Sequence, residues 1–112
     1  MAVTVTVLIP GKTAESTQTT QYTSTGVTTI IDKFTATNYS ASPVTLSINL
    51  VTSPGSPGNE NLVVKTKTLQ ASETYTFPEI VGQVLSPAGS ISTIASASSA
   101  VNIRASGRQV TQ

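Results

Sequence analysis

Residues 43–51 read PVTLSINLV, and this stretch decides the fold class. Its apolar side chains at positions 44, 46, 48 and 50 alternate with polar ones, which is the period of a β-strand with one buried face. The same period occurs near both ends of the chain, in VTVTV (residues 3–7) and in VNIRAS (residues 101–106). These three segments are therefore predicted to be half-buried strands.

Further strands are expected in four less regular segments, which are residues 26–38, 62–69, 73–77 and 90–95. In the first of them Ile30 shares a face with the charged Asp32, whereas Ile31 faces out. A β-bulge near Ile31 and Asp32 would resolve this conflict. Seven or eight short strands with turn signals between them predict an all-β, antiparallel β-sandwich. Alternation alone leaves a jelly-roll-like and an immunoglobulin-like topology both open.

The connections carry residues that are typical of turns. Residues 38–43, NYSASP, predict a polar turn that joins its two flanking strands as a hairpin. The richest Pro/Gly stretch, residues 53–61, predicts an exposed, flexible loop. Pro78 is followed by Ile80, Val84 and Leu85 at helical spacing, which predicts one short helical turn near residues 78–85.

The chain has 112 residues, which is the size of a single domain. Within it, residues 1–26 are expected to form an N-terminal strand or arm, and residues 27–112 the β-sandwich. A chain of this length buries only about two-thirds of the surface that its unfolded form exposes. Association with further copies or with a partner is therefore expected to add stability.

Charge and composition limit the partners that the chain can have. Only 10% of residues are charged, with 6 Lys and Arg against 5 Asp and Glu, so neither a nucleic acid nor a membrane is expected as a partner. No basic segment precedes the apolar start at residues 2–9, and no apolar run approaches the ~20 residues that span a bilayer. We therefore expect a soluble protein without an export signal. The absence of cysteine favours assembly in a reducing cytoplasm.

The sequence contains no histidine and no cysteine, which bears on catalysis. These residue types supply the usual base at neutral pH, the commonest metal ligands and the thiol nucleophile. The 5 acidic residues are scattered among turns and strand ends, without the convergent pair that glycoside hydrolysis needs. Lys65 and Lys67 alternate on one strand, where they would discourage edge-to-edge aggregation. The chain is expected not to be an enzyme and to have no cofactor, no metal ligands and no catalytic residues.

Residues that bind a partner are expected in three places. The valine-rich first strand could add itself to a neighbouring sheet. The Pro/Gly loop is an exposed point of contact. Two arginines near the end of the chain could pair with acids on a neighbouring subunit, or could simply face solvent. The candidate partner-binding residues are Val3, Val5, Val7, Pro54, Pro57, Asn59, Arg104 and Arg108.

Three segments resemble small structural proteins of tailed phages, namely TIIDKFTATN (29–38), KTLQASETYTFPEIVGQVL (67–85) and VNIRASGR (101–108). The chain looks most like the cement or staple proteins that decorate the heads of some short-tailed phages. The resemblance implies a jelly-roll-like sandwich that binds the outer surface of the major capsid protein shell and stabilises the head. It also implies a homodimer or homotrimer on the capsid exterior of the virion, assembled in the host cytoplasm. These segments carry no motif for the capsid contact, so no site residue is carried over.

The sequence leaves two other functions open. The chain could be a different virion component, such as a tail or head-tail joining protein. It could also be a carbohydrate-binding sandwich used in adhesion. The decoration hypothesis predicts saturable binding to assembled shells and poor binding to isolated capsid subunits, which separates it from both.

Overall fold

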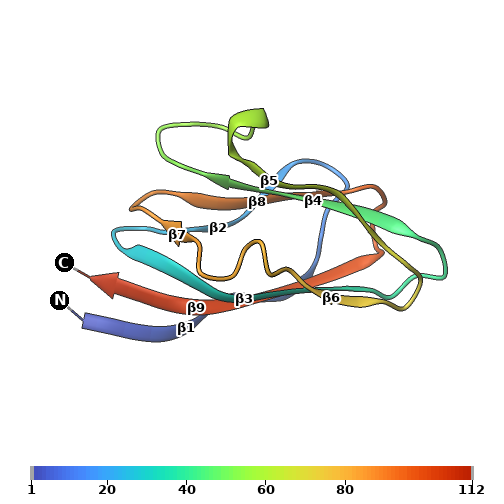
Figure 1. Cartoon of the computed structure of the whole chain (residues 1–112), viewed down its shortest axis with the longest axis horizontal. Helices are drawn as coiled ribbons and strands as arrows, with labels where there is room; N and C mark the ends of the chain where they lie inside the picture. The colour runs from blue at the N-terminus through green and yellow to red at the C-terminus, as the bar shows by residue number, and fades with distance from the viewer. Residues whose placement is uncertain (1, 112) are drawn as a thin grey trace.

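The computed structural model describes residues 2–111. These residues form β-strands, the turns between them and a single 3-10 helix. The strands pair antiparallel in two sheets that pack face to face (Figure 1). This confirms the predicted all-β, antiparallel sandwich. The strands are β1 (Ala2–Thr13), β2 (Thr19–Thr23), β3 (Thr28–Asn38), β4 (Val44–Val51), β5 (Leu62–Leu69), β6 (Thr74–Thr76), β7 (Val84–Leu85), β8 (Ser90–Ala95) and β9 (Val101–Thr111).

Successive strands often lie in different sheets. The first sheet, which we call sheet A, has the strand order β1-β9-β3-β6, and β7 also pairs with β3. The second, sheet B, has the order β2-β8-β4-β5. The N-terminal residues 2–26 contribute β1 to sheet A and β2 to sheet B, so the chain enters both layers before β3 begins.

The hydrophobic core lies between the two sheets. Phe34 of β3 and Phe77 are fully buried, and their rings meet edge to face with 5.5 Å between centroids. Tyr75 of β6 contacts Phe77 in the same geometry at 4.8 Å. This is the arrangement that aromatic quadrupoles favour. The other large, fully buried apolar side chains are Ile9, Ile31, Leu46, Ile48, Leu69, Ile80, Ile91, Val101 and Ile103.

The predicted β-bulge in β3 is confirmed. Ile31 pairs with Gly107 of β9 and Lys33 pairs with the preceding Ser106, so Asp32 is the extra residue. Ile31 is fully buried, and Ile30 points to the opposite, outer face of sheet A. The extra residue shifts the alternation by one position, so that Ile31 before it and Phe34 after it are both buried in the core.

The predicted hairpin over residues 38–43 is wrong, because β3 belongs to sheet A and β4 to sheet B. The buried Asn38 holds this crossing in place. Its side-chain amide donates to the carbonyl oxygens of Ser42 (2.8 Å) and Leu69 (3.0 Å), and its Oδ1 accepts from the N–H of Ser40 (2.9 Å). Turn residues indicate that the chain reverses, but they do not indicate whether it stays in one sheet.

The predicted helical turn near residues 78–85 is also wrong. The chain makes two successive turns, in which Ile80 bonds to Phe77 and Gln83 bonds to Ile80, and then pairs with β3 as β7. Ile31 donates its N–H to the carbonyl of Gln83 (3.0 Å) and accepts from the N–H of Gly82 (2.6 Å). Pairing with β3 satisfies backbone groups that a helix would have used internally.

The Pro/Gly loop between β4 and β5 ends in the 3-10 helix η1 (Asn59–Asn61). Asn49 of β4, which is buried, donates its amide to the carbonyl of Gly58 (3.0 Å) and to Oδ1 of Asn61 (2.7 Å). Asn61 in turn donates to the carbonyl of Ser56 (3.0 Å). These bonds fasten the base of the loop to sheet B.

Candidate docking surface

One half of sheet A has the usual polarity of a sandwich sheet. In β9, Val101, Ile103 and Ala105 are buried, whereas Asn102 and Arg104 between them are exposed. An apolar inner face and a polar outer face are expected where a sheet covers a core and faces water. We call this the core half of sheet A, built from residues 33–38 and 101–105.

The other half of sheet A reverses this polarity. Its inner face carries a row of three polar residues that are cross-strand neighbours, Thr4, Gln109 and Thr29. We call this the terminal half, built from residues 2–7 of β1, 28–31 of β3 and 107–111 of β9. Its outer face carries the apolar side chains of Val3, Val5, Val7, Ile30, Val84 and Val110, which we call the outer patch.

Two residues of the polar inner row, Thr29 and Gln109, are satisfied by hydrogen bonds within the chain, whereas Thr4 is exposed. The Thr29 hydroxyl lies 2.8 Å from the Tyr22 hydroxyl and 2.6 Å from that of Ser24. Gln109 donates its amide to the Tyr22 oxygen at 2.8 Å. A buried polar group with partners carries little penalty, so this end of the sandwich does not need inward apolar side chains.

Two β-bulges produce the reversal. The pairing of β1 with β9 passes from Val7 opposite Ser106 to Ile9 opposite Ala105, which leaves Leu8 as an extra residue. Leu8 and Ile9 are both buried, whereas Val7 is exposed. An extra residue shifts the alternation by one position, so the odd-numbered valines before it face out and Ile9 after it faces in. Asp32 has the same effect in β3.

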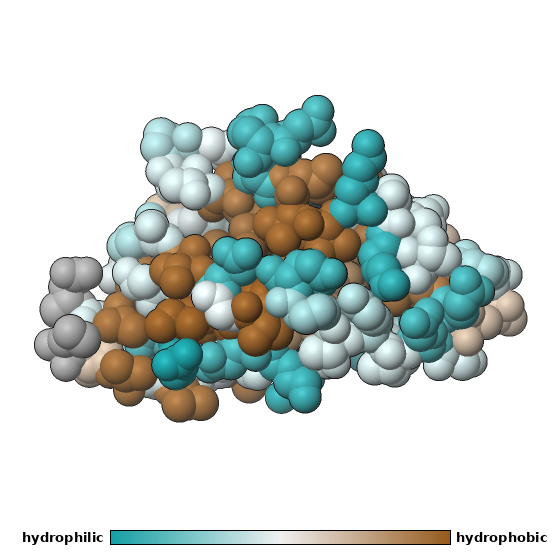
Figure 2. Space-filling model, in the orientation of Figure 1, coloured by the Kyte–Doolittle hydropathy of each residue, from teal (hydrophilic) through white to brown (hydrophobic). Residues whose placement is uncertain are grey.

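The outer patch is exposed to an extent that is unusual for valine. The exposed fractions are 80% for Val5, 58% for Val3, 56% for Val84 and 45% for Val7. Val5, Arg108, Ile30 and Val84 face one another in sequence across β1, β9, β3 and β7, so they form one continuous row. Figure 2 shows hydrophobic side chains gathered at the lower left, beside the ends of β1 and β9. Contiguous exposed apolar surface marks a site of interaction.

Arg108 lies within the outer patch and is already paired with an acid of its own chain. Its guanidinium donates to both carboxylate oxygens of Asp32, with the shortest bond at 2.9 Å. The hydrogen bond to Asp32, together with its negative charge, raises the pKa of Arg108 above its ordinary value. The structure therefore gives Arg108 a partner on β3, within the same molecule.

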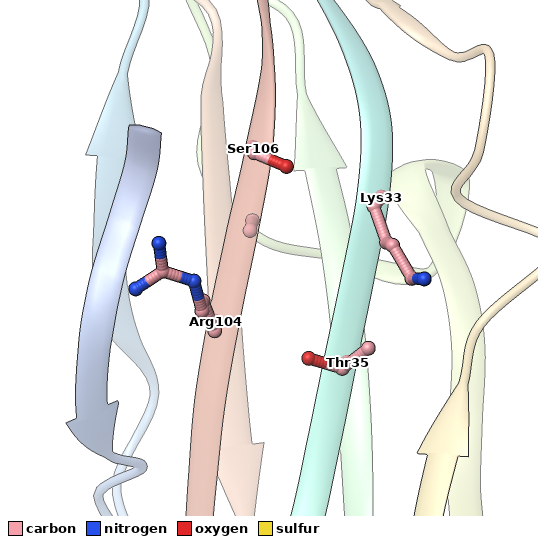
Figure 3. A pocket seen from close by; sticks show the side chains of 5 residues that line it. Lys33, Thr35, Arg104 and Ser106 are labelled. Carbon is pink, nitrogen blue, oxygen red and sulfur yellow. The ribbon is translucent and has the colours of Figure 1, made fainter. Parts of the chain in front are cut away.

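Arg104 lines a shallow pocket of about 250 Å³ on the outer face of the core half. Lys33, Thr35 and Ser106 complete its wall, and Figure 3 shows Arg104 reaching from β9 toward β1 while Lys33 extends from β3. Arg104 donates to the carbonyl of Pro10 at 3.0 Å, which fixes its position. Arg104 and Lys33 thus stand on opposite sides of the hollow, with their charged ends pointing away from each other.

The structure separates the sequence-predicted partner residues into two groups. Val3, Val5, Val7, Arg104 and Arg108 share the outer face of sheet A. Pro54, Pro57 and Asn59 belong to the loop on sheet B, where the last two help to line a cleft of about 400 Å³ with both polar and apolar walls. A single flat partner would therefore contact one group or the other.

Sequence reasoning missed three members of the outer patch and the lysine of the pocket. Val110 could have been found, because β9 has no bulge and this residue has the same parity as Arg104 and Arg108. Ile30 was noticed only as part of a broken alternation. Val84 carried no usable signal, since its segment was predicted to be helical.

Comparisons of the chain with protein-family models, with curated proteins and with solved structures found no match. Within residues 2–111 there is no group of three His, Cys, Asp or Glu side chains placed to hold a metal ion. In the same residues, no helix has the length and apolar character needed to cross a membrane. The site is therefore described by its own geometry: a sandwich with an apolar patch and a basic pocket on one outer face.

Proposed function

We propose that this chain is a capsid decoration protein, which binds the outer surface of a shell of major capsid protein and stabilises the head. The observation that carries the proposal is the outer patch on sheet A, where apolar side chains face away from the molecule's own core. The resemblance to cement and staple proteins of phage heads supplies the identity of the partner. Such a protein would act on the exterior of the virion as a homo-oligomer.

The surface has the composition that protein partners require. An interface needs an apolar centre and a polar rim, and a charged group within it is less costly to bury when it is already paired. The outer patch provides the apolar centre, the Arg108–Asp32 pair is neutralised internally, and the Arg104 pocket lies alongside on the neighbouring rows of β9 and β3. Many such contacts, repeated over a shell, add up through effective concentration even when each one is weak.

The strand order also supports a jelly-roll topology. A jelly roll has eight strands in two sheets, arranged as two Greek keys. If β6 and β7 are counted as one interrupted strand beside β3, the orders β1-β9-β3-β6 and β2-β8-β4-β5 fit that pattern. An immunoglobulin domain instead places its first, second, fifth and fourth strands in one sheet. We therefore favour the jelly roll of the two topologies that the sequence left open.

The direct test is binding of the purified chain to shells that lack it. We expect saturable binding to assembled shells and little binding to isolated capsid subunits, measured by co-sedimentation. Val84→Lys should weaken binding at least about tenfold, because it places a charge on the outer patch. Thr68→Lys adds the same charge to an exposed position of β5 in sheet B and should bind as the wild type does.

The proposal fails if the wild-type chain does not bind shells, or if both lysine variants bind equally well. Electron microscopy of particles carrying the labelled chain then separates head from tail. A position at the tail or at the head-tail junction would replace decoration with a different structural role in the virion.

A second candidate function is glycan binding through the cleft on sheet B. Gln18, Ser47, Asn49 and Asn59 line it, together with Lys65, and amides and hydroxyls are the groups that hydrogen-bond to sugars. We expect any glycan found in an array screen to lose affinity in Asn59→Ala and to be unaffected by Val84→Lys. The absence of any hit in the screen would remove this candidate.

A further inference from the structure

The outward edge of β1 differs from every other edge of the two sheets. In sheet B, the edge strand β5 carries Lys65 and Lys67 and is kinked at Thr66, whose φ is +46°. The other sheet B edge, β2, has only five residues, and the far edge of sheet A consists of the short β6 and β7. Charge, irregularity and shortness are the usual means of preventing edge pairing. β1 has none of these over residues 2–7.

The backbone of β1 directs alternate groups to this free edge. Ala2 turns its N–H and carbonyl toward β9, where both contact the hydroxyl of Thr111. On the other side of β9, the N–H and carbonyl of Ile31 bind residues 83 and 82, and therefore point away from β9. Alternation along each strand then points the backbone groups of Thr4 and Thr6 to β9. Those of Val3, Val5 and Val7 point away from the sheet.

We propose that a second copy of this chain pairs with β1 along this edge, antiparallel, about a two-fold axis that passes through Val5. In this register Val5 faces Val5 of the second copy, and Val3 faces Val7. Each of these pairs can exchange two backbone hydrogen bonds, so every free N–H and carbonyl of the three valines is satisfied. An axis at Val3 or at Val7 would leave two of the three valines opposite positions outside this set.

The sequence of β1 is suited to pair with itself. Residues 3–7 read VTVTV, which is the same in both directions, so the antiparallel pair matches valine with valine and threonine with threonine. β-branched and Thr–Thr cross-strand pairs are favourable, and no like charges meet. The register from Ala2 to Val7 is unbroken, whereas the bulge at Leu8 and the missing N–H of Pro10 limit how far pairing extends. A self-complementary edge is what an isologous dimer interface requires.

The dimer adds to the proposed function and does not depend on it. Because Val3, Val5 and Val7 point to the outer face, the two copies would place their outer patches side by side on one continuous sheet. Two patches on one rigid body bind a shell more tightly than one, through effective concentration. Val84 lies on β7, at the far side of sheet A from β1, so capsid contact and self-association can be altered separately.

The first test measures the mass of the wild-type chain and of Val5→Pro in solution. The wild type should sediment at about twice its 11.5 kDa at micromolar concentration. Proline at position 5 removes an N–H that points to the free edge, so the fold should persist while the dimer dissociates. Val84→Pro is unsuitable as a control because β7 is paired, and Val84→Lys serves instead: it should remain a dimer.

The second test fixes the register, and the lack of native cysteine makes it unambiguous. Under oxidation Val5→Cys should form a covalent dimer, because hydrogen-bonded partners lie about 5.5 Å apart, within disulfide range. Val3→Cys alone should not, since its own copy lies roughly 13 Å along the strand. An equimolar mixture of Val3→Cys and Val7→Cys should cross-link.

These results would overturn the proposal in different ways. A wild-type chain that is folded and monomeric at high concentration excludes self-pairing. Cross-linking of Val3→Cys alone excludes the Val5 axis. If the wild type is monomeric and Val5→Pro loses shell binding as Val84→Lys does, the edge receives a strand of the capsid protein. If the dimer forms as predicted and shells are not bound, only the proposed function fails.

Discussion

The two halves of sheet A share the strands β3 and β9 and have opposite polarity. In the core half the buried residues other than Asn38 are apolar, with Phe34 and Ile103 fully enclosed. In the terminal half the inner row of Thr4, Gln109 and Thr29 is polar, and the valines face out. In β1 and β3 the difference arises at single-residue insertions, whereas β9 changes from apolar to polar inner residues without one. Its lesson is that alternation reports which residues share a face, while the bulges decide which face is the core.

The largest effect expected from this comparison is on the stability of the core half. Phe34→Ala removes a buried ring that packs against Phe77, and should lower the free energy of unfolding by roughly 3–5 kcal/mol. Val84→Ala removes an apolar side chain from the outer patch and should change it by less than about 0.5 kcal/mol. Urea denaturation of both variants measures the difference. Equal costs would mean that the two halves are packed alike.

At the boundary between the halves, Gly107 has no room for a side chain. A methyl group there would overlap the carbonyl oxygen of Ile30 and approach Leu8 Cδ1 to 3.1 Å. Gly107→Ala should therefore cost about 1–3 kcal/mol, because the β3 backbone would have to move. Ser106→Ala, one position earlier, should be close to neutral in the same thermal denaturation series. A neutral Gly107→Ala would show that β3 and β9 can separate at this point.

The polar interior of the terminal half should depend on its hydroxyl network. Thr29→Val keeps the shape of the side chain but leaves the Tyr22 and Ser24 hydroxyls without this partner, at a cost of about 1–2 kcal/mol. Adding Tyr22→Phe should cost less in the Thr29→Val background than in the wild type. A double-mutant cycle by chemical denaturation tests this coupling, and strict additivity would contradict it.

The smallest effect is expected at Glu15, in the connection from β1 to β2. Hydrogen bonds from Lys12 and Gln21, both at 2.8 Å, lower the pKa of its carboxyl group. A lowered pKa in the folded state stabilises the fold above the unfolded pKa, and this contribution is lost as pH falls through the folded pKa. Glu15→Gln should cost about 0.2–0.5 kcal/mol at neutral pH, since the pair is exposed.

The pH dependence supplies the control for this last variant. The stabilities of the wild type and of Glu15→Gln should converge in acid, where the carboxyl group is protonated and can no longer attract Lys12. A gap that stays constant from neutral pH to acid would mean that the hydrogen bond from Gln21, rather than charge, accounts for the effect.

Much of the fold could be predicted from the sequence because strand alternation is a local property. The strand at residues 44–51 and the bulge at Asp32 follow directly from which neighbours are apolar. The strand β2 was predicted only as part of an N-terminal strand or arm, because Thr and Gln on both of its faces give no alternation. The crossing at Asn38 and the strand β7 were missed for a different reason. They depend on partners distant in sequence, Leu69 and Ile31.

The candidate site was only partly predictable, for the same reason. The valines of β1 were identified as partner residues, although their alternation by itself also fits a buried strand. Only the bulge at Leu8, which depends on pairing with β9, determines that they face out. The internal pairing of Arg108 with Asp32 requires β3 to lie beside β9 in the observed register. No local pattern contains that information.

Ala2 and Thr111 are direct cross-strand partners, with 3.1 Å between the Ala2 nitrogen and the Thr111 hydroxyl. A short peptide could therefore join β9 to β1, and new ends could be opened in the Pro/Gly loop near Ser56. Such a circular permutant would keep the outer patch intact. Cargo fused at the new ends would then project from sheet B, on the side that a decorated particle would turn to the medium.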